Sequence, residues 1–395
     1  MEVEVRQAIN FCKPGKAPGP DMLGNDWYRE YADLLTPILG RLFNMWFGSG
    51  VFPKSFLEAD IFCIKKSGNS SNPLNYRPIA LLNTDYKLFT RILANRVSCT
   101  LRDCIHGNQN GFVPGRTIHS TLNLFAAAQC MAQADEDMED AVTLLLDFQK
   151  AYDSLDRTFL VEALRKHGYP EQFVQAVAKL HAGTTARFLA NGERSRRVSI
   201  TCGIRQGCPL APLLFILALD PLYRQIDLHP DISGVVLHST GGHKELRVVG
   251  FADDTTVYLR TAAKVAILLT LTPFFGQASG LLLNELKTLV IALNPRAHQD
   301  GAHLPAPLQF MDKSHHGRYL GVQVGSTDGS AATWIKADAQ LALRLRLAMQ
   351  KTMTVDQRSV IAAAIIVPKL LFIAQHAWPT AAHILSLDRK ICNFV

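Results

Sequence analysis

The sequence lacks the short motifs of several well-known classes of site. Its eight cysteines form no CxxC pair, and no cysteine and histidine cluster has the spacing of zinc ligands. It also has no Walker-type phosphate-binding loop and no nucleophile elbow. No disulfide framework is evident, so a reducing compartment is the expected environment. A zinc site, a P-loop and an α/β-hydrolase triad are therefore excluded as catalytic centres.

Targeting segments and long apolar runs are missing too. The N-terminus, Met1–Arg6, is charged and has no apolar signal-peptide core. The longest uninterrupted apolar runs, Ala211–Leu219 and Val360–Val367, are too short to span a bilayer. We therefore expect a soluble intracellular protein of the nucleus or cytoplasm, without a membrane partner.

The composition and net charge suit a folded protein that binds a negatively charged polymer. The chain has 395 residues, of which 48% are hydrophobic and 19% charged, enough for one large multi-lobed domain or two ordinary ones. The formal net charge is +7, which suits a polyanion such as nucleic acid. Many soluble proteins carry a similar charge, so this signal is weak alone.

Helical patterns and antiparallel hairpin signals alternate irregularly along the chain. Val142–Leu146 is a short apolar run typical of a buried strand, and Asn191-Gly192 predicts a hairpin turn. The β-like runs Leu246–Phe251 and Thr255–Leu259 flank a second predicted hairpin. Because there is no regular βαβ alternation, the pattern favours an α+β fold over a doubly wound one. Further helices are expected at Trp27–Trp46, Leu81–Leu101, Thr117–Ala134, Arg157–His167, Glu171–His181, Leu213–Ile226, Ala262–Ser279 and from about Trp334 onward.

Three aspartates occupy places where an unpaired charge is costly. Asp147 ends the buried strand, and Asp253 and Asp254 form the tip of an apolar hairpin. Carboxylates from two strands could hold two Mg²⁺ ions for phosphoryl transfer. Because side chains alternate along a strand, we expect Asp147 and Asp253 to be the bridging ligands and Asp254 to support them. The alternative for adjacent aspartates is a solvated turn.

Around these aspartates the sequence resembles the reverse transcriptase of non-LTR (LINE-type) retrotransposons. The matching segments follow the family's order from about residue 13 to 325. They are Lys16-Ala-Pro-Gly-Pro-Asp21, Asn75-Tyr-Arg-Pro-Ile-Ala-Leu81, Gln109-Asn-Gly-Phe-Val-Pro-Gly-Arg116, Leu146-Asp-Phe-Gln-Lys-Ala-Tyr-Asp153, Gly203-Ile-Arg-Gln-Gly-Cys-Pro-Leu210, Phe251-Ala-Asp-Asp254 and Tyr319-Leu-Gly-Val322. A lone Ala-Asp-Asp would be weak, whereas this collinear set is specific.

The resemblance implies a right-hand polymerase with fingers, a palm built on an antiparallel sheet, and a partial helical thumb. We expect an N-terminal extension at 1–53, fingers and palm at 54–325, and a truncated start of the thumb at 326–395. The chain is expected to be a fragment of a longer protein, an isolated domain or the product of a decayed element. Two residues depart from the family pattern: Met22 replaces the usual glycine, and Ala211 replaces the commoner serine.

The resemblance also assigns a metal and nucleotide site. Asp147, Asp253 and Asp254 are the implied metal-binding triad, joined by the backbone carbonyl of Phe148, with two Mg²⁺ ions for which Mn²⁺ could substitute. The implied nucleotide-binding residues are Lys65, Arg77, Tyr152, Gln206, Gly207 and Lys287.

Each of these residues has an implied role and a plainer alternative. Tyr152 would exclude a 2′-hydroxyl from the sugar site, and its alternative is a core aromatic. Lys65, or Lys66 in its place, and Arg77 would grip the triphosphate, or remain solvated charges. Gln206 and Gly207 would line the nucleotide and template base, or form only a helix-entry loop. Lys287 would be a general acid near pyrophosphate, or an exposed strand-end lysine.

Template and primer contacts are implied for two further segments, Gly111, Phe112, Gly115 and Arg116 in one, and Tyr319, Leu320 and Gly321 in the other. No base-specific contact is expected from them. The resulting hypothesis is an RNA-directed DNA polymerase whose partners are an RNA template, a DNA primer or target, and deoxynucleotides. Two alternatives stay open: an inactive nucleic-acid-binding remnant of such an element, and a maturase-type reverse transcriptase encoded by an intron.

Overall fold

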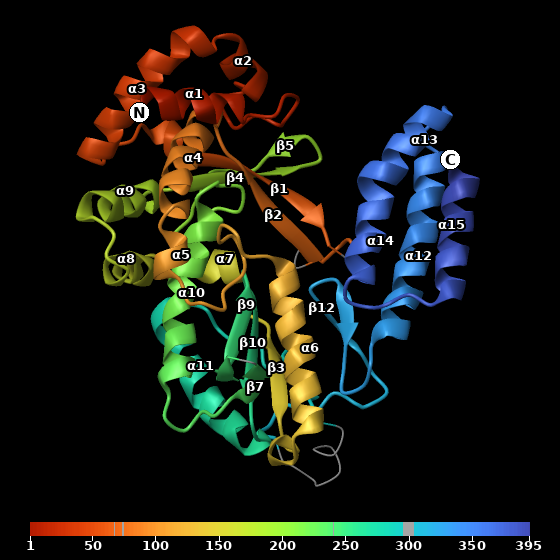
Figure 1. Ribbon diagram of the computed structural model, residues 1–395. Helices are drawn as coiled ribbons and strands as arrows, with labels where there is room; N and C mark the ends of the chain where they lie inside the picture. The colour runs from red at the N-terminus through yellow and green to blue at the C-terminus, as the bar shows by residue number, and fades with distance from the viewer. Residues whose placement is uncertain (67, 73–74, 240, 295–303) are drawn as a thin grey trace.

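The chain folds as a mixture of helices and largely antiparallel sheets, which confirms the α+β class expected from the sequence (Figure 1). The computed structural model describes residues 1–66, 68–72, 75–239, 241–294 and 304–395. The helices are α1 (Glu2–Asn10), α2 (Asn25–Glu30), α3 (Ala32–Ser49), α4 (Thr84–Ser98), α5 (Leu101–Cys104), α6 (Ile118–Ala134), α7 (Ala151–Ser154), α8 (Arg157–Lys166), α9 (Glu171–His181), α10 (Ala211–Leu228), α11 (Val265–Ser279), α12 (Ser330–Met349), α13 (Val355–Ile361), α14 (Val367–Ala374) and α15 (Ala381–Phe394). The strands are β1 (Glu58–Lys65), β2 (Tyr76–Leu81), β3 (Val142–Leu146), β4 (Thr185–Ala190), β5 (Glu193–Arg194), β6 (Val198–Ser199), β7 (Val235–Ser239), β8 (Gly242–Leu246), β9 (Val248–Phe251), β10 (Asp254–Leu259), β11 (Leu289–Ala292), β12 (Gly317–Tyr319) and β13 (Val322–Val324).

The central sheet has the strand order β11-β3-β10-β9, and all its neighbours are antiparallel. Its inner strand β3 is buried on both faces, which explains why four of its five residues are apolar; the fifth, Thr143, donates its hydroxyl to the Val257 carbonyl at 3.1 Å. Leu144 and Leu146 pack into the cluster that includes α10 and α11, while Leu145 packs into the cluster that includes α6. The strand is thus fixed between two hydrophobic layers, and so is the residue that follows it, Asp147.

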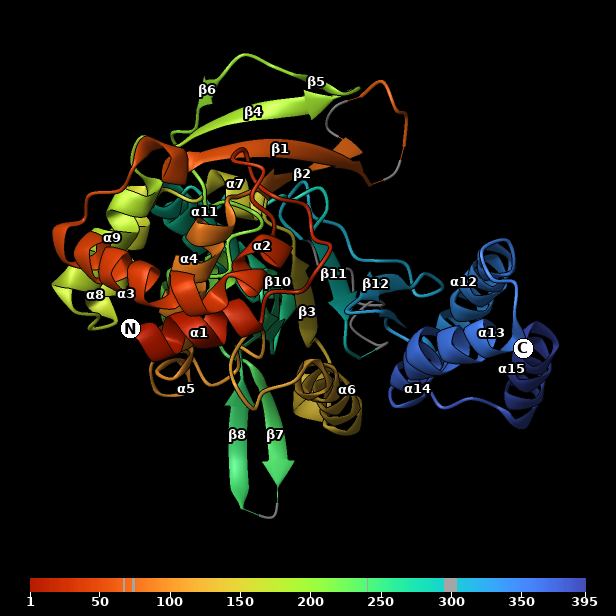
Figure 2. The ribbon, with the colours of Figure 1, turned by 90° about the horizontal axis from the view of Figure 1, so that it is seen from above.

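A second sheet, with the order β2-β1-β4-β5, lies beside the N-terminal helices (Figure 2). Strands β1 and β4 run parallel, whereas β1 and β2 are antiparallel. The predicted hairpin turn joins β4 to β5, and its residues Asn191 and Gly192 have φ angles of 52° and 84°. Both angles are positive, as a tight two-residue hairpin turn requires.

Helices α12, α13, α14 and α15 form a C-terminal bundle that lies to one side of both sheets (Figure 2). The bundle has its own hydrophobic cluster, in which Trp334, Leu370 and Phe394 are buried. Phe372 of α14 contacts both this cluster and the one on the α6 face of the central sheet. Between α13 and α14 the helix widens into a π turn, Ala362–Ile366, just before Pro368, which has no N–H to donate. The bundle therefore packs largely on itself, and Phe372 is one of its few contacts with the side of the central sheet that α6 covers.

The stretch Val355–Ala374 is, by length and composition alone, apolar enough to cross a membrane, with a mean hydropathy of 1.6. Counting only uninterrupted apolar runs in the sequence overlooks it, because polar residues are scattered through the helix. A single helix of this kind is weak evidence for a membrane span. Its residues Ile366, Leu370 and Ile373 pack in the core of the bundle.

The loop Lys16–Asp21 docks against the start of α4. A Cβ on Gly19 would lie 2.3 Å from the backbone nitrogen of Asn83, so only glycine allows this approach. Met22, which stands where the resembled family has glycine, has a φ of 62°. The loop therefore keeps the left-handed conformation that glycine favours, at the cost of backbone strain in a methionine.

Met22→Gly should raise the free energy of unfolding by about 0.5–1 kcal/mol, because glycine adopts a positive φ without a Cβ clash. The Met22 side chain is 67% exposed, so little packing is lost. Urea denaturation would measure the change, with Met22→Ala as the control that removes the side chain and keeps the strain. Equal stability of the two variants would contradict the interpretation.

Candidate active site at the end of the central sheet

The three aspartates meet at one end of the central sheet. In the antiparallel pair of β3 and β10, Leu146 lies opposite Thr255, so Asp147 is level with Asp254 one residue further on. Asp253 lies in the turn between β9 and β10, directly after Ala252, whose φ is 60°. The register of two buried strands thus brings together the carboxylates that the sequence places 106 and 107 positions apart.

The local electrostatics disfavour three negative charges in this place. Loss of surrounding water, together with the charges of Asp253 and Asp147, raises the pKa of Asp254 to about 6. Desolvation and the charge of Asp147 also raise the pKa of Asp253, while the guanidinium of Arg77 partly opposes this. In the described part of the chain, no lysine or arginine forms an ion pair with these carboxylates. A bound cation would relieve the repulsion.

The donor set fits a hard divalent cation such as Mg²⁺, which prefers carboxylate oxygens. Among residues 1–66, 68–72, 75–239, 241–294 and 304–395, however, no three His, Cys, Asp or Glu side chains are close enough together to hold a metal ion. Phe148 is buried and pairs with Leu283, so its backbone is held beside Asp147. The chemistry of the residues therefore fits the cation, although the three carboxylates do not form a compact group of ligands.

Next to Asp253 lies a cavity of about 300 Å³ that several of the predicted nucleotide-binding residues share. Its lining combines charged, aromatic and small residues from separate parts of the chain: Arg77, Tyr152, Gln206, Gly207, Cys208, Ala211, Pro212 and Asp253. The apolar members Cys208, Ala211 and Pro212 were not singled out from the sequence as part of a site, because small apolar residues at a helix start carry no chemical signal.

Tyr152 forms one wall of this cavity. Its ring stacks on Phe215 of α10, with the centroids 4.7 Å apart and an angle of 20° between the planes. The backbone carbonyl of Tyr152 accepts a hydrogen bond from Ile204 N at 2.8 Å. Desolvation and the nearby charge of Asp253 raise the pKa of its hydroxyl, so Tyr152 is neutral at physiological pH. The ring is half-buried and firmly held at the edge of the cavity.

The Gln206-Gly207 turn is held against β2. Ala80 N donates a hydrogen bond of 2.8 Å to the Gln206 carbonyl, and a Cβ on Gly207 would lie 2.5 Å from the Ala80 carbonyl oxygen. Gly207 also has a φ of 120°, so both the space and the conformation require glycine. The turn therefore joins the second sheet rigidly to the start of α10.

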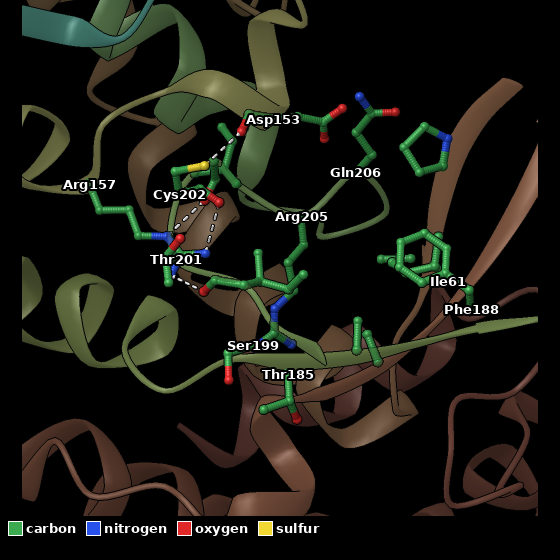
Figure 3. A pocket seen from close by; sticks show the side chains of 17 residues that line it. Ile61, Asp153, Arg157, Thr185, Phe188, Ser199, Thr201, Cys202, Arg205 and Gln206 are labelled. Carbon is green, nitrogen blue, oxygen red and sulfur yellow. Dashed lines mark hydrogen bonds between the residues drawn. The ribbon is translucent and has the colours of Figure 1, made fainter. Parts of the chain in front are cut away.

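Behind this turn is a second cavity of about 350 Å³, which Gln206 also lines (Figure 3). At its edge Arg157 donates hydrogen bonds to four backbone carbonyls and to the Thr184 hydroxyl. Arg205 is buried, with its guanidinium 4.9 Å above the ring of Tyr86 and one nitrogen bonded to the Leu57 carbonyl. Arg205, which could from sequence have been a phosphate ligand or a solvated charge, instead connects the turn to the core.

The two predicted phosphate-binding residues of β1 and β2 point to opposite faces of the second sheet. Ile64 lies opposite Arg77 in the register, and Lys65 lies opposite Tyr76. Since neighbours along a strand alternate, Arg77 faces the cavity and Lys65 faces away, where its ammonium donates to the Ser70 hydroxyl at 2.7 Å. The structure thus brings Arg77, but not Lys65, to the cavity.

Lys287 is exposed and lies in a turn just before β11. Leu289 of β11 is opposite Leu145 of β3, so Lys287 comes near the level of Asp147. The preceding segment is tied to the same place, because Asn284 N donates to the Asp147 carbonyl at 2.7 Å.

Of the four residues of the predicted template loop, Phe112 and Gly115 are exposed, Gly111 is buried and Arg116 is half-buried. Phe112 is 48% exposed with a φ of 60°, whereas Gly111 packs against the backbone of Ala252. Arg116 donates to the carbonyls of His106 and Gln109, at 2.7 and 2.8 Å, and desolvation lowers its pKa. The Arg116 side chain therefore holds the loop in shape. Gly115 has a φ of 79° and lies near Arg102.

The predicted primer segment is a hairpin turn between β12 and β13. Leu320 and Gly321 have positive φ angles of 46° and 100°, as a tight turn requires. Tyr319 is buried, and its hydroxyl accepts a hydrogen bond of 2.8 Å from Thr256 of β10. The turn is therefore anchored on the central sheet, close to Phe372 of the bundle.

Comparison with known proteins places these features in one family. Residues 64–324 match the family described as reverse transcriptase (RNA-dependent DNA polymerase). The chain is 30% identical over 253 residues to a 149 kDa protein of the transposon TX1 from Xenopus laevis, covering 64% of this chain and 19% of that protein. It is 25% identical over 399 residues to a retrovirus-related Pol polyprotein from the type-1 retrotransposable element R2 of Popillia japonica, covering 98% of this chain and 53% of that one.

A further relative is the RNA-directed DNA polymerase from the mobile element jockey of Drosophila melanogaster, 29% identical over 269 residues, which are 67% of this chain and 28% of that one. The chain thus spans between about a fifth and about half of the length of these relatives. The family match covers well over half of the chain and includes both the carboxylates and the cavity beside them. This chain therefore belongs to the reverse transcriptase family and is related to the reverse transcriptases of non-LTR retrotransposons.

Proposed function

We propose that this chain is the catalytic core of an RNA-directed DNA polymerase of a non-LTR retrotransposon, which adds deoxynucleotides to a primer 3′-hydroxyl. The observation that supports this most is the cavity of about 300 Å³ at which Arg77, Tyr152, Gln206, Gly207 and Asp253 meet. A cation-binding carboxylate, a guanidinium and an aromatic wall are the groups that a deoxynucleoside triphosphate needs. The retrotransposon relatives favour this element type over an intron maturase.

In this proposal the second sheet corresponds to the fingers, the central sheet to the palm and the C-terminal bundle to the start of the thumb. The boundaries follow as 1–53 for the N-terminal extension, 54–325 for fingers and palm, and 326–395 for the thumb. Phe112, Gly115 and the Leu320-Gly321 turn would then border the path of template and primer.

Each side chain has a defined task in the proposed reaction. Arg77 binds the phosphates, for which a planar guanidinium is suited. The half-buried ring of Tyr152 lies beneath the sugar, and Gln206 with Gly207 supports the nucleotide against the start of α10. Asp147, Asp253 and Asp254 would hold two Mg²⁺ ions, which neutralise charge on the phosphates and activate the primer hydroxyl. Lys287 is proposed to donate a proton to the departing pyrophosphate.

A matched deoxynucleotide with Mg²⁺ should slow the dissociation of a primer–template whose primer is chain-terminated. The triphosphate completes the cation coordination that the carboxylates begin, and pairing with the template base positions it near Arg77. A mismatched nucleotide should leave dissociation unchanged. The measurement is the dissociation rate of a labelled primer–template at fixed salt, because counterion release makes all such binding salt-dependent.

The same experiment distinguishes the enzyme from an inactive nucleic-acid-binding remnant. A remnant would bind the primer–template through its positive charge, and the dissociation rate would not depend on the nucleotide. Equal dissociation rates with matched nucleotide, mismatched nucleotide and no nucleotide would overturn the proposed function. Arg77→Lys is the matched control for the dissociation measurement. It keeps the positive charge at residue 77 and removes the bidentate phosphate contact of the guanidinium.

A further inference from the structure

The turn that carries Asp253 has a conformation that its own sequence does not favour. Ala252 has a φ of 60°, in the left-handed region where a Cβ is disfavoured. Asp253 follows directly, so the backbone angles of Ala252 determine the position and the direction of the Asp253 side chain. Something outside the hairpin must therefore hold Ala252 in place.

The side chain of Gln109 makes this contact from the loop before α6. Its Oε1 accepts a hydrogen bond from Ala252 N at 2.9 Å, and its Nε2 donates to the Ala252 carbonyl at 3.1 Å. Oε1 also accepts from Gly111 N at 2.8 Å, and Nε2 donates to the Tyr223 hydroxyl at 3.4 Å. Gln109 is only 2% exposed, and its amide uses both donors and both acceptor positions. One side chain thus binds both backbone polar groups of the strained residue.

The backbone around Gln109 is built to bring its amide to this position. Asn110 N donates to the Gly250 carbonyl at 2.7 Å, and Gly250 N donates to the Asn108 carbonyl at 3.0 Å, so the loop runs parallel to β9 as an added edge. A Cβ on Gly111 would lie 2.2 Å from Ala252 N, and one on Gly250 would lie 1.8 Å from the Tyr223 hydroxyl. Glycine at these two positions permits the close approach on which the Gln109 contacts depend.

We infer that Gln109 is a positioning residue for the cation site: it stabilises the left-handed conformation of Ala252 and thereby directs the Asp253 carboxylate. This inference rests on the proposed function for its consequence in catalysis, but not for its effect on the turn. A buried glutamine that merely fills the core would satisfy its amide with any nearby groups. Gln109 instead binds the N–H and the C=O of the one residue in this turn with a positive φ.

Residue 252 is the second position at which the role of Gln109 can be tested. Glycine adopts a left-handed conformation without a Cβ clash, so a turn with glycine at 252 needs less support. Gln109→Met keeps the length and apolar packing of the side chain but removes its hydrogen bonds. We expect Gln109→Met to raise the Kd for Mn²⁺ by about tenfold, equivalent to about 1.4 kcal/mol. Adding Ala252→Gly to this variant should lower its Kd for Mn²⁺ again, by at least about threefold relative to Gln109→Met alone.

The experiment is a double-mutant cycle on the full chain with Gln109→Met, Ala252→Gly and the combined variant. Mn²⁺ binding is measured by electron paramagnetic resonance, and amide exchange of Gly111 and Ala252 by hydrogen–deuterium exchange. In Gln109→Met both amides should exchange faster, since both lose the Oε1 acceptor. Gln109→Asn, which keeps the amide but is one methylene shorter, replaces Gln109→Met if the latter does not fold.

These measurements need no polymerase activity, so a chain that fails to extend primers still tests the role of Gln109. Where extension is observed, the Mg²⁺ concentration for half-maximal rate should rise while the KM for the nucleotide changes little. The inference is overturned if a folded Gln109 variant binds Mn²⁺ as tightly as the parent chain. It is equally overturned if Ala252→Gly recovers no affinity, because a merely structural role would not depend on the conformation of residue 252.

Discussion

Asp253→Asn should reduce primer extension on an RNA template by at least about 10³-fold, because in the proposed site a neutral amide would not hold the cations as a carboxylate would. Asp147→Asn should do the same. The assay is extension of a labelled DNA primer with Mg²⁺, and Asp103→Asn, an exposed carboxylate of α5, is the matched control. Full activity of either active-site variant would refute the proposed metal site.

The same substitution should stabilise the fold, which separates loss of chemistry from loss of structure. The pKa of Asp254 is raised to about 6 by desolvation and then by its two neighbouring carboxylates. Between about pH 4 and 6 the folded chain therefore keeps a proton that the unfolded chain loses, so the free energy of unfolding falls as the pH rises. Asp253→Asn removes one repelling charge, and we expect a gain of about 1 kcal/mol at pH 7 in metal-free buffer, since solvent screens part of the repulsion.

Tyr152→Ala should weaken the preference for deoxyribonucleotides over ribonucleotides by about 10- to 100-fold. The ring stacks on Phe215 and cannot move aside easily, so its removal opens space for a 2′-hydroxyl. Single-nucleotide incorporation with each sugar measures the ratio.

Tyr152→Phe is the matched control for this prediction. It keeps the ring and its stacking, and it should keep the preference, because the raised pKa of the Tyr152 hydroxyl already excludes an ionised role at neutral pH. If Tyr152→Ala stays active with an unchanged ratio, the residue is an ordinary core aromatic.

Sequence patterns predicted the elements that carry the carboxylates well. The bounds of β3 agree with the predicted run, because a short and mostly apolar segment that ends at Asp147 forms a clear signal. The hairpin around Asn191-Gly192 was also recognisable, since its turn needs two positive φ angles. Tyr152, Gln206 and Gly207 were identified by resemblance, and the structure places them at one cavity.

Other features depend on contacts that no local pattern reveals. The hairpin of β7 and β8 was missed because β8 is largely exposed and contains His243, Lys244 and Glu245, which do not alternate with apolar residues. Arg205 lies over the ring of Tyr86 and donates a hydrogen bond to the Leu57 carbonyl, and both residues are more than a hundred positions away in the chain. Gln109 likewise acts on a residue 143 positions later. Sequence spacing alone cannot foresee such pairs.

The separate core of the C-terminal bundle has a consequence for how this protein melts. The bundle meets the rest of the chain at few places. Phe372 packs on the α6 side of the central sheet, and His376 stacks on His119 of α6, with ring nitrogens 2.7 Å apart. Thr333 and Lys336 of α12 bond Gln323 of β13. Loss of the bundle would expose its own cluster and would take Phe372 from the cluster at the α6 face, while the buried residues of the other two clusters stay in place. The chain is therefore expected to unfold in at least two cooperative units. A single transition temperature would average over both. Changes at Met22 or Asp253 would then shift only the transition of the sheets, and a probe on the bundle would not register them.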